Sequence, residues 1–153
     1  MMAARRLASE EPAEDAVAVL ARELHALAGD RDALEGGLAV VARHLRAERL
    51  HFRARGEDGF ILGEVIRGGP ALLAEDAVVA AEDGELVQVF IHADAGTIRF
   101  MLTHAFALEL GRGTALLAFA RAREQFTSVE RATLRALLPH LVVAWRASRL
   151  QSR

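Results

Sequence analysis

The spacing of apolar residues near the N-terminus predicts two helices. Apolar positions recur every three or four residues between Pro12 and Gly29, at Val17, Leu20, Leu24 and Leu27. A second stripe with the same period lies within residues 30–47 and consists of Leu34, Leu38, Val41 and Leu45. Gly36 and Gly37 weaken the start of the second helix, because glycine has a low helix propensity.

From Arg49 onward the apolar period changes to two, which is typical of β-strands. Residues 49–55 alternate between apolar and polar side chains, the Gly-Glu-Asp-Gly sequence at 56–59 predicts a turn, and residues 60–67 predict the returning strand. Gly-Gly-Pro at 68–70 ends this hairpin. Residues 71–85 are then expected to form a short helix whose outer side carries Glu75, Asp76, Glu82, Asp83 and Glu85.

A second hairpin is predicted around a two-residue turn at Asp94 and Ala95. With the turn at this position, the predicted register pairs Ile91 with Ile98, Val89 with Phe100 and Val87 with Leu102, and these six residues form one continuous apolar face. On the opposite face it pairs Phe90 with Arg99 and Gln88 with Met101.

The C-terminal part of the chain predicts one more strand, at residues 114–121, and one long helix. Thr127 and Glu130 fit a capping box at the start of that helix, which is expected to run to Leu150. The order of elements is two helices, two strands, a short helix, three strands and a long helix, which predicts an α+β fold around an antiparallel sheet. We expect one domain over residues 12–150, preceded by a disordered N-terminus at residues 1–11.

Composition narrows the class of protein. The chain has 153 residues, of which 52% are hydrophobic and 26% charged, as in one soluble globular domain. It contains no cysteine, which excludes disulfides, thiolate nucleophiles and thiolate zinc sites. All 19 basic residues are arginine, a bias typical of a GC-rich bacterial genome. No apolar run suits a signal sequence or a membrane span, so we expect a cytoplasmic protein with no membrane partner.

Charge is unevenly distributed along the chain. Residues 112–153 carry eight arginines against two acidic residues, whereas residues 1–111 carry 11 arginines against 19 acidic residues. Two oppositely charged segments can satisfy each other or a sister subunit. The arginine-rich segment lacks the stacking ladder and the recognition-helix pattern of nucleic-acid binders, so we expect no direct contact with nucleic acid.

No constellation of residues predicts an enzyme, a metal site or a bound cofactor. The serines lie in predicted helices, caps or tails, outside any nucleophile motif. The Gly-Arg-Gly sequence at 111–113 lacks the third glycine of a dinucleotide loop. Strand alternation places His92 and His104 on opposite faces, which argues against a shared metal ion. An enzyme would need a cleft with two convergent titratable groups, for instance Glu64 with His92.

Residues 126–145, and most specifically Leu-Leu-Pro-His-Leu at 137–141, resemble the close of the GAF-like sensor domains found upstream of LuxR-type helix-turn-helix regulators in bacteria. Residues 39–52 resemble the helix that enters the first strand of such domains. The resemblance implies a GAF/PAS-like five-stranded antiparallel sheet of order 2-1-5-4-3. It also implies that the N- and C-terminal helices pack on one face, with a ligand pocket on the other. This sequence contains no helix-turn-helix. We therefore expect either a sensor domain cut from a longer protein or a free-standing relative that acts through a separate signalling or DNA-binding partner.

The face away from the terminal helices provides a candidate ligand site, made of Gln88, Phe90, Arg99, Met101 and Thr103. Arg99 would anchor an anion there. In the alternative, these side chains form core beneath residues 71–85, and Arg99 pairs with Glu82 or Glu85.

The last helix provides a candidate dimer interface, the stripe of Leu134, Leu138, Leu141 and Trp145. Trp145 would anchor a homodimer, or in the alternative cover the end of the monomer core.

Two functions remain open at this point. The first is a non-enzymatic sensory domain that dimerises through its terminal helices and binds a small molecule to control a transcriptional or signalling output. The second is a dimerisation or adaptor domain with a filled core and no ligand. A cavity beneath residues 68–85 would favour the sensor, and dense packing there would favour the adaptor.

Overall fold

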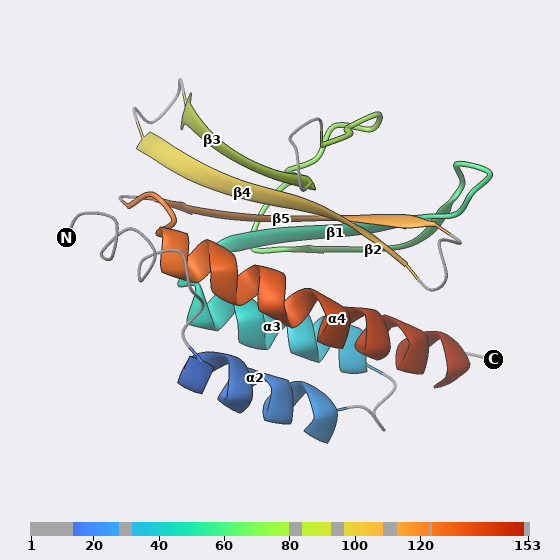
Figure 1. Cartoon of the computed structure of the whole chain (residues 1–153). Helices are drawn as coiled ribbons and strands as arrows, with labels where there is room; N and C mark the ends of the chain where they lie inside the picture. Colours follow the sequence, from blue (N-terminus) through green and yellow to red (C-terminus); the bar gives the residue numbers. More distant parts are fainter. Residues whose placement is uncertain are drawn as a thin grey trace. The chain divides into compact units, whose positions relative to one another are not determined.

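Figure 1 shows the computed structural model of the chain, which describes residues 14–27, 32–79, 84–92, 97–108, 113–122 and 124–151. Side chains are described within these ranges except at 88–92, 97–98 and 150–151. The chain forms two compact units, one made of helices from both ends of the chain and one that spans residues 46–126 and contains the sheet. The predicted disordered N-terminus lies outside the described residues.

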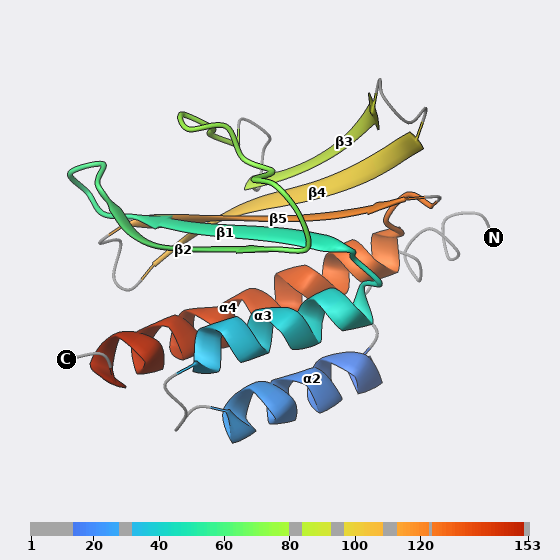
Figure 2. The same ribbon diagram turned by 180° about the vertical axis from the view of Figure 1, so that it is seen from behind.

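The helical unit consists of α2 (Glu14–Ala26), α3 (Ala33–His44) and α4 (Ser128–Gln151), which pack against one another (Figures 1 and 2). Gly37 permits a close approach of the first two helices, because a Cβ at this position would lie 2.5 Å from Cδ2 of Leu24. The backbone N–H of Leu34 donates to Oγ of Ser148 at 3.1 Å and so ties α3 to α4. The predicted apolar stripes supply buried side chains, among them Leu20, Leu24, Leu34, Leu38 and Val41.

The long helix α4 begins with the predicted capping box. Oγ1 of Thr127 accepts a hydrogen bond from the N–H of Glu130 at 3.1 Å, and Oε1 of Glu130 accepts one from the N–H of Thr127 at 2.9 Å. The helix then continues through the exposed Pro139 to Gln151, close to the predicted end. In the part of the chain that the structure describes, no helix is long and apolar enough to cross a membrane.

The sheet contains β1 (Arg49–Arg55), β2 (Ile61–Arg67), β3 (Glu85–His92), β4 (Thr97–Ala107) and β5 (Thr114–Ala122). Its strand order is β2-β1-β5-β4-β3, and every neighbouring pair is antiparallel. The predicted α+β class and the order 2-1-5-4-3 are therefore confirmed. All five predicted cross-strand pairs of the second hairpin are also confirmed. Its predicted turn residues, Asp94 and Ala95, lie outside the described residues.

Strand alternation gives the sheet two different faces. One face, which we call the strap face, carries His51, Arg53 and Arg55 of β1. The register extends this face across β5 and β4 through Leu116, Ala118, Met101, Thr103 and Ala105. The opposite face carries buried apolar side chains, including Leu50, Phe52, Leu102, Leu117 and Phe119.

Residues 70–79, which we call the strap, follow β2 and are not helical. The helix predicted over residues 71–85 is therefore wrong for residues 71–79. The reason is tertiary: the side chains of β1 bind the strap backbone, so its polar groups need no partners within a helix. Gly68, two residues before the strap, has a φ of 83°, and a Cβ at this position would collide with the carbonyl oxygen of Glu48.

The acidic residues assigned to that helix have different positions. Glu75 and Asp76 are exposed on the strap, whereas Glu85 belongs to β3. The side chain of Glu85 is buried and lies 3.9 Å from Nε2 of His104. Glu82 and Asp83 lie outside the described residues.

Replacing Thr127 with alanine removes the acceptor of the capping box, so we expect the free energy of unfolding to fall by about 1 kcal/mol. Urea unfolding followed by circular dichroism measures this loss. Thr127→Ser keeps the hydroxyl oxygen and should retain most of the stability. Equal losses for Thr127→Ala and Thr127→Ser would contradict the capping role.

Candidate functional site

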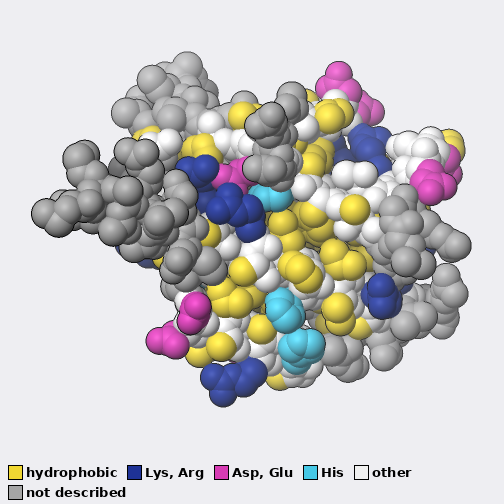
Figure 3. Space-filling view, in the orientation of Figure 1, with side chains coloured by type: hydrophobic (Ala, Val, Ile, Leu, Met, Phe, Trp, Pro, Cys, Tyr) yellow, Lys and Arg dark blue, Asp and Glu magenta, His cyan; other side chains and the backbone are white. Residues whose placement is uncertain are grey.

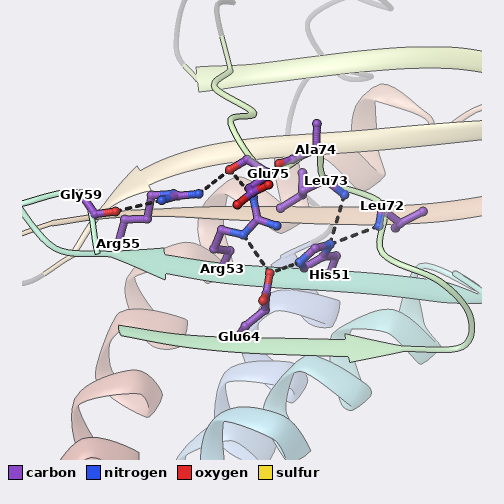
Figure 4. A network of polar contacts seen from close by, with 9 residues as sticks. All are labelled: His51, Arg53, Arg55, Gly59, Glu64, Leu72, Leu73, Ala74 and Glu75. Atoms are coloured by element: carbon purple, nitrogen blue, oxygen red, sulfur yellow. Dashed lines mark hydrogen bonds and ion pairs between the residues drawn. The ribbon is translucent and has the colours of Figure 1, made fainter. Parts of the chain in front are cut away.

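The strap is held to the sheet by a buried histidine of β1. The side chain of His51 is fully buried, and its Nδ1 accepts hydrogen bonds from the backbone N–H groups of Leu72 and Leu73, both at 3.1 Å (Figure 4). Because Nδ1 accepts two hydrogen bonds, the ring proton lies on Nε2. Nε2 then donates to Oε2 of Glu64 at 2.5 Å.

The same carboxylate oxygen of Glu64 accepts a hydrogen bond from Arg53. Nε of Arg53 donates to it at 2.8 Å, while Nη1 donates to the carbonyl oxygens of Ala74 at 2.6 Å and Glu75 at 3.3 Å (Figure 4). Arg53 is almost completely buried, and the charge of Glu64 balances its own. Glu64 of β2 therefore joins both strap-binding side chains into one network.

Arg55 makes the third attachment to the strap. Its Nη1 donates to the carbonyl oxygen of Gly59 at 2.8 Å, and its Nη2 donates to the carbonyl oxygen of Glu75 (Figure 4). Both acceptors are neutral. Arg55 thus differs from Arg53, whose charge is matched by a carboxylate.

The environment of Glu64 changes its acidity. Burial raises the pKa of Glu64, but the hydrogen bonds and charges of His51 and Arg53 together outweigh burial and hold the pKa below its ordinary value of 4.5. The network therefore favours the charged carboxylate in the folded protein.

Apolar packing completes the attachment of the strap. Leu73 is buried in a cluster with Leu116 and Ala118 of β5. The partly buried side chains around this cluster come from the strap and from β4, namely Leu72, Ala77, Val79, Met101 and Ala105. Apolar side chains of the strap therefore cover this part of the strap face.

Beside this cluster lies a cavity of about 210 Å³. The strap and three strands of the sheet line it with apolar side chains, two guanidinium groups and one hydroxyl: Ala77, Val78, Val79, Ala105, Leu116, Arg53, Arg55 and Thr114. All these residues belong to the unit that contains the sheet. The cavity is the candidate ligand site in the described part of the chain.

By the register, the ligand-site residues predicted from the sequence share the strap face, and Arg99, Met101 and Thr103 are not among the residues that line this cavity. Met101 packs around Leu73, and Thr103 is buried with no hydrogen-bond partner for its Oγ1 among the described residues. Nη1 of Arg99 lies 3.3 Å from Oε2 of Glu48, so among the described residues its acidic partner is Glu48 and not Glu85, one of the two acids considered in the alternative. The other, Glu82, lies outside the described residues. The side chains of Gln88 and Phe90 are outside the described set.

Sequence reasoning missed the roles of His51, Arg53, Arg55 and Glu64, although the pattern contained a signal. Period-two alternation had placed the three β1 residues on one face. The hairpin register pairs Arg53 directly with Glu64, which makes a cross-strand ion pair predictable. Glu64 and His92, the example given above of two convergent titratable groups, belong to β2 and β3, the two edge strands of the sheet.

The predicted dimer residues of α4 are buried in the single chain. Leu134, Leu138, Leu141 and Trp145 are each at most 8% exposed. On the outer side of α4, Val143 is 42% exposed, and Pro139 and Arg146 are exposed as well.

The described residues contain no group of three or more histidine, cysteine, aspartate or glutamate side chains that could hold a metal ion. The register places His92 and His104 on opposite faces of the sheet. His25 of α2 and His140 of α4 make an edge-to-face contact, with ring centroids 5.4 Å apart.

Comparisons with known proteins support the fold. No family model and no curated protein matches the chain. A match among solved structures is the phycoerythrobilin-bound GAF domain from a cyanobacterial phytochrome, with a TM-score of 0.58 and 14% sequence identity. The match covers 90% of this chain and 98% of the other. The chain therefore has the fold of a GAF domain.

Glu64→Gln tests the electrostatic part of the strap network. Because folding lowers the pKa of Glu64, its charge stabilises the fold above the ordinary value of 4.5, and this contribution is lost as the pH falls through the folded pKa. We expect the free energy of unfolding to drop more steeply below about pH 4.5 in the wild type than in Glu64→Gln. Urea unfolding between about pH 3 and pH 7 measures both slopes.

Glu57→Gln is the matched control, because Glu57 is exposed in the turn between β1 and β2. This variant should keep the wild-type dependence on pH. If wild type and Glu64→Gln lose stability equally on acidification, the network does not stabilise the carboxylate.

Proposed function

We propose that this chain is a non-enzymatic sensory or regulatory domain that binds a small molecule between the strap and the sheet. The cavity of about 210 Å³ carries the proposal. This volume corresponds to about seven water molecules, which suits a ligand built on one or two small rings. A mostly apolar wall with a few polar donors is typical of small-molecule sites. The phytochrome domain of the same fold also holds a small molecule, phycoerythrobilin.

A binding role is favoured over catalysis by the state of the titratable groups near the cavity. His51 is fully buried, and both of its ring nitrogens are hydrogen-bonded. Glu64 binds His51 and Arg53 through one oxygen. These hydrogen bonds hold the strap. A general base would instead need a ring nitrogen or a carboxylate oxygen within reach of a substrate, so the contacts of His51 and Glu64 favour a binding role.

The second candidate is an adaptor with a filled core, and the packing around Leu73 favours it. Leu73, Leu116 and Ala118 leave this part of the strap face filled. The two candidates differ in the neighbouring cavity, which a sensor fills with a ligand and an adaptor does not.

We propose further that the domain forms a homodimer through its terminal helices. The predicted stripe of α4 is buried in the single chain, so the outer side chains are the ones available to a second copy. Val143 of α4 and Val19 of α2 are exposed apolar residues of the helical unit. Figure 3 shows hydrophobic side chains gathered over these helices, with histidine side chains among them.

The connection from β5 to α4 supports an output through the last helix. Leu116 and Thr114 of β5 line the cavity, and the same strand ends beside the buried Arg121. Arg121 donates to the carbonyl oxygens of Glu124 at 2.9 Å and Gln125 at 2.7 Å and lies over the ring of Phe126. A ligand that shifts β5 would thereby bias the start of α4. A transcriptional or signalling partner in the cytoplasm would read this change, without direct contact of the domain with nucleic acid or membrane.

Indole, a small neutral ring compound, tests whether the cavity binds ligands. We expect indole to shift the amide NMR signals of Ala77, Val79 and Leu116 in a saturable titration. Ala105→Leu fills part of the cavity and should weaken indole binding by about tenfold, because overlap with the added atoms opposes binding. Ala107→Leu is the control, since Ala107 is exposed on the same strand and face outside the cavity.

Native mass spectrometry of protein purified without added ligand complements this titration by detecting a retained small molecule. No retained mass, together with no response to indole, would favour the adaptor over the sensor.

Val143→Arg tests the dimer. The wild type is expected to sediment as a dimer. Arginine at position 143, which is exposed in the single chain, should give a folded monomer because it places a charge in the apolar interface of the proposed dimer. Ala39→Arg adds the same charge at an exposed position of α3 and should remain dimeric. A monomeric wild type, or a dimeric Val143→Arg, would exclude this interface.

A further inference from the structure

Arg55 contributes to the cavity wall a positive charge that has no acidic partner among the described residues. It is half-buried and lies at the end of β1, where the pairing with β2 is irregular. Its hydrogen bonds to Gly59 and Glu75 go to neutral backbone carbonyls. Within the described ranges, no carboxylate forms an ion pair with Arg55, whereas Glu64 pairs with Arg53.

The residue beside Arg55 adds a second donor on the same wall. Thr114 of β5 is the direct cross-strand partner of Arg55, and both side chains line the cavity. A guanidinium group next to a hydroxyl suits the oxygens of a carboxylate. The remaining wall is mostly apolar, with alanine, valine and leucine side chains.

From this arrangement we infer that the cavity selects a small monoanion, a carboxylate carried on a compact apolar group. The inference rests on the proposed function, because it names the ligand class of the same cavity. One unbalanced arginine calls for one negative charge, since a partly buried charge is stable when it is paired. The cavity of about 210 Å³ limits the apolar part to about the size of one ring.

Three probes of nearly the same shape test this selection: benzoate, the neutral benzamide and the cationic benzylamine. Their dissociation constants follow from titrations of the amide signals of Ala77, Val79 and Leu116. We expect benzoate to bind about tenfold or more tightly than benzamide, because a charge-assisted hydrogen bond is stronger than a neutral one. Benzylamine should bind least. Added salt should reduce the advantage of benzoate.

Arg55→Gln should bring the affinities for benzoate and benzamide within about twofold of each other, because the charge is lost. Arg43→Gln is the matched control, since it removes an exposed arginine of α3, in the other unit, and should preserve the difference. If Arg55→Gln also abolishes indole binding through a loosened strap, Arg55→Lys decides. A preference for benzoate retained in Arg55→Lys supports the charge, and its loss there overturns the role of charge.

Equal wild-type affinities for benzoate and benzamide would overturn the selection of anions while leaving a ligand-binding cavity. Binding of indole without any binding of benzoate would do the same. The absence of binding for all four compounds would overturn both this inference and the proposed sensor function.

Discussion

The hydrogen bonds of His51 are the constraint on which the strap face depends. A fully buried imidazole must have both nitrogens satisfied, and here one accepts two backbone N–H groups of the strap while the other donates to Glu64. Glu64 in turn binds Arg53, which holds two carbonyl oxygens of the strap. The contacts reach the backbone of the strap, so they position residues 72–75 without depending on their side chains.

This attachment also explains why a cavity lies next to a filled core. Leu73 is brought onto Leu116 and Ala118, where it closes the strap face. Farther along the strap, Ala77, Val78 and Val79 have short side chains, and the wall opposite them contains Ala105 and Thr114. Small residues on both sides leave space. Arg53 and Arg55 serve the strap and the cavity together, so a ligand that contacts either guanidinium would also change how firmly the strap is held.

The two units use their apolar stripes in different ways. In the helical unit, the regular stripes of α2, α3 and α4 are buried within the single chain, and the capping box defines the start of α4. In the sheet unit, both faces mix buried polar side chains with apolar ones, namely His51, Arg53 and Thr103 on the strap face and His104 and Arg121 on the opposite face. The short connection from β5 to α4, bound by Arg121, is the covalent route between the sheet and the last helix.

Local pattern determined most of the fold. Period-two alternation and turn residues placed the strands and the register of the second hairpin, because side chains alternate strictly along a strand. Helical spacing and the pair of Thr127 and Glu130 placed the long helix. The tertiary structure decided the strap and the site. A helix over residues 71–79 was reasonable from local sequence, but its backbone groups found partners in His51, Arg53 and Arg55, about 20 residues earlier in the chain. The pairing of Arg99 with Glu48 and the position of the cavity likewise depend on contacts between segments distant in sequence, which no local pattern encodes.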